Sequence, residues 1–209
     1  WDKKIYPRKN KSDVTISAYT ESIRVGAVFP PIEVQKVSNY KNGSDEPKEV
    51  WLILDGVHRW QAYQKIGDKD DLEKIEEVEV VEWKPGETLD YKASWIELLL
   101  RGSRLNTDHG DRIDNKDKEK VACSIAEADP EIKYTEEMIA GELRVTRQTI
   151  NNWISTIRAR QKAGRDNTIH KLSRLGWTQE EIAEEVGIDR SSVSKIVNNA
   201  NFGEIHNFL

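Results

Sequence analysis

Two stretches of the chain, residues 134–155 and 177–198, repeat each other without a gap. They read YTEEMIAGELRVTRQTINNWIS and WTQEEIAEEVGIDRSSVSKIVN. Threonine, alanine and a set of apolar residues recur at matching places. The matched pairs are Thr135 with Thr178, Ile139 with Ile182, Ala140 with Ala183, Leu143 with Val186, Val145 with Ile188, Ile150 with Val193, and Trp153 with Ile196. The second half of the chain is therefore expected to hold two copies of one helical pair.

Each copy has the pattern of a helix-turn-helix. The threonine can cap the first helix, the alanine allows a close helix crossing, and the apolar turn residue fills the core. Outward positions of the second helix are then left to meet DNA, where Arg, Gln and Asn bond base edges and Ser or Thr bond phosphates. Either copy taken alone could also be a plain packing module. The predicted DNA-binding residues are Thr146, Arg147, Gln148, Thr149, Asn151 and Asn152 in the first copy, and Arg190, Ser191, Ser192 and Lys195 in the second.

The net charge of −5 hides an uneven distribution of charge. Residues 144–174 carry eight lysines or arginines and one acid, Asp166, and they run from within the first repeat to just before the second. Two helix-turn-helix patterns flanking a basic segment predict a protein that binds double-stranded DNA. The first copy is expected to be the better reader, because the first helix of the second copy carries four glutamates that would repel phosphate. These are Glu180, Glu181, Glu184 and Glu185.

The first half of the chain shows strand signals, whereas residues after about 104 show only helical patterns. We expect an α+β fold: a small α/β domain at 1–115, then an all-α DNA-binding domain at 116–209, joined within residues 104–120. The predicted elements of the first domain are strands at 30–37 and 49–56 joined by the polar loop 38–48, a helix at 58–66 stopped by Gly67, a strand at 76–83, and a helix from Thr88 as N-cap to Gly102.

The composition favours a soluble cytoplasmic protein. The first residues, WDKKIYPRKNK, lack the apolar core of a signal peptide, and the apolar runs are too short to span a membrane. The single cysteine, Cys123, cannot form an internal disulfide, and its apolar neighbours indicate a small buried residue rather than a nucleophile. Because the first residue is not Met, we expect a fragment of a longer protein.

The stretch WLILDGVHRWQAYQKIG, residues 51–67, turns from a strand into a helix at Gly56. A glycine at such a turn lets backbone N–H groups approach an anion, and the start of the helix adds partial positive charge. His58 and Arg59 would supply further donors to phosphate oxygens. On spacing alone, the same residues are also typical of an ordinary turn with solvated side chains.

The stretch LDGVHRWQAYQKIG resembles the phosphate-binding box of the ParB/sulfiredoxin superfamily, which matches at Gly56, His58, Arg59 and Ala62. Residues 19–34 are similar to the family's Ser-Ile, Gly, Pro-Ile-x-Val run, and IYPR, which contains Arg8, resembles its opening strand. ParB proteins carry Glu-Asn-x-x-Arg before their helical domain. Here Asn106 matches, Leu105 replaces the Glu, and His109 stands where the Arg would be.

The resemblance implies a ParB-like clamp for DNA partition that binds CTP, or another nucleoside triphosphate, with Mg²⁺. It implies a homodimer on double-stranded DNA, associated with the nucleoid or a plasmid, with a partition ATPase as a candidate partner. Because a neutral histidine cannot replace a guanidinium, His109 weakens the cofactor claim more than the fold claim. The implied nucleotide-binding residues are Arg8, Gly56, His58, Arg59, Asn106 and His109.

Two alternatives stay open. The first is a ParB-like transcriptional regulator that has the fold without a nucleotide switch. The second is an enzyme of the superfamily, a phosphotransferase. Sulfiredoxin chemistry needs a cysteine where this chain has Val57. ParB-like serine kinases read Asp-Gly-His-His-Arg, so Asp55 remains a candidate carboxylate. At most, slow hydrolysis of the nucleoside triphosphate is expected.

Overall fold

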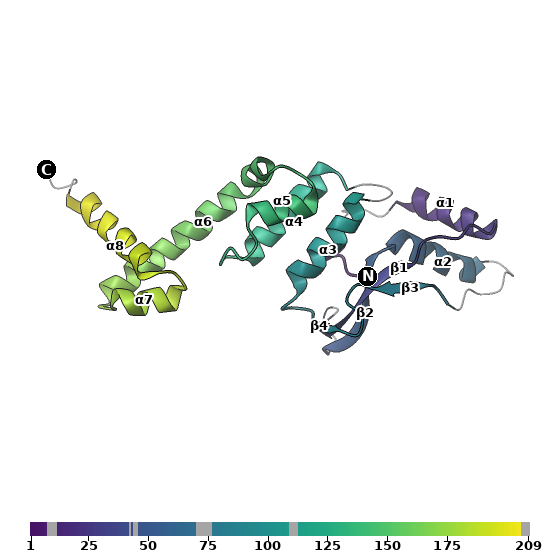
Figure 1. The fold of residues 1–209 in the computed structure, drawn as a ribbon, viewed down its shortest axis with the longest axis horizontal. Coiled ribbons are helices and arrows are strands. Elements are labelled where there is room, and N and C mark those ends of the chain that lie inside the picture. Colours follow the sequence, from purple (N-terminus) through teal and green to yellow (C-terminus); the bar gives the residue numbers. More distant parts are fainter. Residues whose placement is uncertain (8–11, 42, 44–45, 70–76, 109–112, 206–209) are drawn as a thin grey trace.

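A four-stranded sheet forms one end of an elongated molecule, and helices form the rest (Figure 1). The computed structural model describes residues 1–7, 12–41, 43, 46–69, 77–108 and 113–205. Strand β1 (Ile32–Tyr40) is central: it pairs antiparallel with β2 (Lys48–Asp55) and parallel with β3 (Val80–Glu82) and β4 (Thr88–Asp90). The fold is thus α+β, as the sequence predicts.

The two faces of the sheet differ because side chains alternate along β2. Leu52 and Leu54 are buried on the face that packs against α3 (Trp95–Asp108). Trp51, the residue before Leu52, belongs to the opposite face and is half exposed. The buried face defines the sheet core, whose buried members are Ile5, Val37, Leu52, Leu54, Tyr91 and Leu98.

The predicted strands at 30–37 and 49–56 are confirmed as β1 and β2, and a helix does follow Gly56, as α2 (Val57–Lys69). Gly67 does not stop that helix, which continues for two more residues. The strand predicted at 76–83 is shorter, since β3 has three residues.

The helix predicted from Thr88 is wrong at both ends. Residues 88–90 form β4, because they pair with β1 in register, with Thr88 opposite Lys36. The helix α3 begins only at Trp95 and runs through Gly102 to Asp108. A Cβ at Gly102 would lie 3.4 Å from the carbonyl oxygen of Leu54. Gly102 therefore lets α3 lie close against β2, and it does not end the helix.

Two features near the N-terminus are not predicted by the sequence patterns. Residues 13–24 form helix α1 (Asp13–Arg24), whose N-cap is Ser12, and its contacts are with α2. The opening strand implied for residues 5–8 is wrong for its described part, because residues 3–5 form a turn and Ile5 is buried in the sheet core.

The remaining helices fill the second half of the molecule, as predicted. They pack around two further cores. The first helical core has buried members from α3 to α6, among them Leu99, Ile125, Leu143 and Ile150. The second helical core is centred on Ile169, Ile182 and Val193. The helices are α4 (Asn115–Ala128), α5 (Glu136–Leu143), α6 (Arg147–Arg174), α7 (Gln179–Val186) and α8 (Arg190–Ile205).

Candidate nucleic-acid interface and phosphate pocket

The first helix-turn-helix unit consists of α5 and the N-terminal half of α6. Thr135 caps α5 by accepting a bond from the N–H of Met138, and Thr146 caps α6 by accepting from the N–H of Thr149 at 3.1 Å. The turn between the helices passes through Arg144 in a left-handed conformation, with φ of 50°. The repeat therefore forms the helix, turn and helix that its sequence predicts.

The outward residues of the first unit lie on the exposed side of α6. Arg147, Gln148, Asn151 and Asn152 are all exposed. The side-chain amide of Gln148 donates to the Oδ1 of Asn152 at 2.9 Å, so the two amides hold each other on one face. The Thr146 hydroxyl lies 2.8 Å from that of Thr149, and both take part in the cap. Four polar side chains thus remain outward for contact with a ligand.

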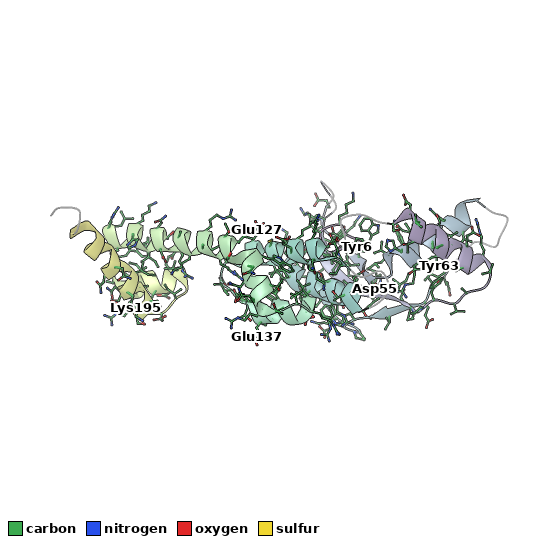
Figure 2. All side chains as sticks on the ribbon, turned by 90° about the horizontal axis from the view of Figure 1, so that it is seen from above. Tyr6, Asp55, Tyr63, Glu127, Glu137 and Lys195 are labelled. Carbon is green, nitrogen blue, oxygen red and sulfur yellow. The ribbon has the colours of Figure 1, made fainter. Side chains whose placement is uncertain are left out.

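The second helix-turn-helix unit consists of α7 and α8 after the end of α6. Thr178 and Glu181 form a reciprocal capping box, and Gly187 ends α7 in a left-handed conformation with φ of 68°. Ile182 and Val193 are fully buried between the helices. Lys195 is exposed on α8 and points away from α6 (Figure 2).

Several of the predicted DNA-binding residues of the second unit are bonded to acidic side chains. Arg190 pairs through its Nε with Glu180 at 2.9 Å. The hydroxyls of Ser191 and Ser192 donate to the carboxylate of Asp189, which also accepts the N–H of Ser192. These bonds, led by that from Ser191, lower the pKa of Asp189 below its ordinary value. Asp189 acts as the cap of α8, a role that the sequence reasoning missed although an Asp before a helix is its usual signal.

The basic segment supplies less surface charge than its count implies. Arg158 is nearly buried and donates to the carbonyl oxygens of Asp129 at 2.6 Å and Tyr134 at 3.2 Å. It therefore ties the loop between α4 and α5 to α6. Arg160, in contrast, is exposed and only loosely paired with Glu127 at 3.7 Å.

Comparison with known proteins places a DNA-binding element at the C-terminal end. A helix-turn-helix family model matches residues 171–201, which span the last turn of α6, all of α7 and most of α8. No model of the ParB/sulfiredoxin superfamily matches. A comparison with curated proteins finds no match. The second unit is thus a helix-turn-helix DNA-binding domain. Among the described residues, no helix is long and apolar enough to cross a membrane.

A pocket of about 410 Å³ lies where α2 begins. Gly56, His58 and Arg59 line it from the strand-to-helix turn, and Asn106 lines it from α3. The structure therefore brings together the four predicted nucleotide-binding residues that it describes. Arg8 and His109, the other two, lie outside the described residues.

Arg59 is held by bonds within the protein. Its Nη2 pairs with Asp55 at 2.7 Å, and its Nη1 donates to the carbonyl oxygen of Pro30 at 2.6 Å. Gly56 has φ of 91°, and a Cβ there would lie 3.0 Å from Nη2 of Arg59. The glycine thus serves two purposes: it permits the positive φ, and it leaves room for the guanidinium to fold back over the turn.

His58 and Asn106 are also held by internal bonds. The Nε2 of His58 accepts the backbone N–H of Ser12 at 3.2 Å, which joins the start of α1 to α2. The Nδ2 of Asn106 donates to the carbonyl oxygen of Gly102 at 2.7 Å. Both side chains are buried, so their positions are fixed before any ligand arrives.

The pocket contains a carboxylate that the sequence reasoning did not identify. Glu33, on β1, lines it and receives two bonds from the guanidinium of Arg101, at 2.7 and 2.9 Å. No local pattern marks this pair, because its members lie 68 positions apart and meet only through the packing of α3 on the sheet. The two carboxylates of the pocket, Glu33 and Asp55, are therefore each paired with an arginine.

Proposed function

We propose that the chain is a DNA-binding protein with a nucleotide switch. Its two helix-turn-helix units would bind double-stranded DNA, and the pocket at the start of α2 would bind a nucleoside triphosphate, CTP first, with Mg²⁺. The observation that carries the proposal is the convergence of Gly56, His58, Arg59 and Asn106 at one helix N-terminus. Backbone N–H groups at such an end are a ready site for a phosphate.

The described residues of the pocket can bind a phosphate if one bond of Arg59 is exchanged. The start of α2 can supply backbone donors, and Arg59 can supply a guanidinium if a phosphate oxygen takes the place of Asp55. Among the described residues, no group of three His, Cys, Asp or Glu side chains could hold a metal. A magnesium ion would therefore depend mainly on phosphate oxygens, as Mg²⁺ commonly does.

The position of Asn106 supports a connection between the pocket and the DNA-binding part. This residue lies near the end of α3, whose Leu99 and Leu100 pack in the first helical core. That core also contains Ile150 of α6, next to the outward residues of the first unit. A ligand that shifts α3 would thus act on a helix that DNA is expected to contact. We propose a homodimeric clamp in DNA partition, with a partition ATPase as partner, as the form of this switch.

The bonds of Arg59 to Asp55 and to the prolyl carbonyl oxygens favour a second candidate, a transcriptional regulator. In that protein the turn at Gly56 would stabilise the fold and bind no nucleotide. An enzyme of the same superfamily would use Asp55 as its carboxylate. The three candidates differ in what they do to a nucleoside triphosphate: the clamp binds it, the regulator does not, and the enzyme consumes it.

Isothermal calorimetry with each of the four nucleoside triphosphates and Mg²⁺, with and without duplex DNA, separates these candidates. We expect heat of binding with CTP and its loss in Arg59→Ala. Arg104→Ala is the matched control, because Arg104 is exposed and pairs with Glu142 at 3.5 Å rather than lining the pocket. Circular dichroism of both variants checks that they fold. Absence of heat with every nucleotide supports the regulator, and rapid phosphate release without DNA supports the enzyme.

A further inference from the structure

Helix α6 belongs to both helix-turn-helix units. Its N-terminal part is the second helix of the first unit and contributes Ile150 and Ile154 to the first helical core. Its C-terminal part contributes Ile169 to the second helical core, where it contacts α7 and α8. The helix is unbroken from Arg147 to Arg174, so the two units share one rod rather than a linker.

The rod places both units on one side of itself. At about 100° per residue, Ile169 lies about 60° around the helix from Ile154 and about 100° from Ile150. Both cores therefore occupy the same half of the helix surface. In the view of Figure 2, Glu137 of α5 and Lys195 of α8 lie on the same side of α6. At the same rate, Asn151 lies at the same angle around α6 as Ile169, and Arg147 and Gln148 lie within about 60° of it, so one straight duplex could meet these residues and the second unit from one side.

The length of the rod also matches the repeat of DNA. A rise of about 1.5 Å per residue puts Ile150 and Ile169 about 28 Å apart, and the two ends of α6 about 40 Å apart. These values bracket the 34–36 Å or so that separate successive major grooves on one face of a duplex. The reading residues of the first unit lie at one end of α6, and α8 packs near the other.

A cleft of about 730 Å³ lies between the units along α6. Its walls are the loop 130–133 after α4, the side chains of Lys162 and Arg165 on α6, and residues 184–188 at the end of α7. Because the units face each other across this open space, their separation depends on the middle of α6. Around Ala163 and Gly164 that part is exposed, and a Cβ at Gly164 would meet nothing within 4 Å.

We propose that α6 is a fixed spacer that sets the two helix-turn-helix units on successive major grooves of one duplex. The composite site would then have two parts, one helical turn apart, and the spacing between them would be part of what the protein recognises. This inference rests on the proposed DNA binding of both units, and it adds the geometry with which they act.

Insertions after Ala163 test the spacer. Two helix-forming residues turn the second unit by about 200°, whereas twenty-five turn it by only about 20° and move it by about 38 Å, or about eleven base pairs, which is about one turn of the duplex. A DNA site is first selected from a random pool with the native chain. Affinity and the protected region are then measured for the native chain and both insertion variants, on the selected site and on a site with eleven base pairs added in its middle.

We expect the two-residue insertion to weaken binding about tenfold or more and to remove protection from one part of the site. The twenty-five-residue insertion should lose affinity for the selected site and regain it on the lengthened one. A two-residue variant with native affinity and a native protected region would overturn the spacer while leaving DNA binding intact. A native chain that binds no duplex would instead overturn the proposed function itself.

Discussion

Arg59 and Asp55 form an ion pair of 2.7 Å across the turn at Gly56. The guanidinium also bonds the carbonyl oxygens of Pro30 and Pro31, at 2.6 and 3.3 Å. One side chain thus joins three segments: the end of β2, the start of α2 and the residues before β1. A ligand that takes the place of Asp55 on Arg59 would release this ion pair, and binding would then be coupled to a local rearrangement at this pocket.

The substitution Gly56→Ala should lower both stability and nucleotide binding. The new Cβ would face the Arg59 guanidinium at 3.0 Å in a backbone with φ of 91°. We expect the free energy of unfolding, measured in urea, to fall by about 2–3 kcal/mol. Gly26→Ala is the control, because Gly26 has φ of 86° and a Cβ there meets nothing within 4 Å. Equal losses in the two variants would show that Arg59 does not need the space at Gly56.

Replacing Arg147 and Gln148 together by alanine should weaken DNA binding. Both lie on the exposed side of α6, and Arg and Gln are side chains that bond base edges in pairs. We expect the affinity for the selected site to fall about tenfold or more, with a shallower dependence on salt. Arg160→Ala removes an exposed charge from the same helix outside the reading positions and should change little. Unchanged affinity in the double variant would move recognition to the second unit.

Arg158→Ala should destabilise the first helix-turn-helix unit. The side chain is 12 % exposed and bonds the carbonyl oxygens of Asp129 and Tyr134, so its loss removes the donor of Tyr134 and the cation beside the buried carboxylate of Asp129, whose carbonyl oxygen keeps only the N–H of Ile132. We expect a loss of about 2–4 kcal/mol in the free energy of unfolding. For Arg160→Ala, whose side chain is 72 % exposed, we expect a change of about 0.5 kcal/mol or less. Similar losses in both would contradict the structural role of Arg158.

The thiol of Cys123 should react slowly in the folded protein. Burial raises its pKa above the ordinary value, and Glu119 and Glu127 add to that effect. A raised pKa means less thiolate at pH 8, so iodoacetamide should modify the folded chain several-fold more slowly than the chain in urea. The rate should climb as the pH rises past 9. Equal rates in the folded and unfolded chains would indicate an open, reactive cysteine.

Local patterns predict the repeat well because each helix-turn-helix is a local structure. Caps, turn residues and apolar spacing lie within about twenty residues of one another, so Thr135, Thr178 and Gly187 can be assigned from their neighbours alone. The strand pair β1 and β2 is predicted for the same reason, since its members are close in sequence.

Where partners are distant, the same patterns fail. Residues 88–90 stand at the start of a helical pattern that runs to Gly102, but pairing with β1 makes them a strand, and Gly102 marks a contact with Leu54 rather than a helix end. The pocket is partly predictable: Gly56, His58 and Arg59 are adjacent, whereas Glu33 and its partner Arg101 meet only in the folded chain. The predicted domain boundary at 115/116 stays a prediction.

The shared helices have a consequence for how the protein loses its structure. Leu98 of α3 lies in the sheet core while Leu99 and Leu100 lie in the first helical core, and α6 joins that core to the next in the same way. Unfolding of either helix would therefore expose apolar side chains of two cores at once. Heating should make the three cores unfold in one cooperative transition, because neither end of the molecule can melt without withdrawing a helix from the middle.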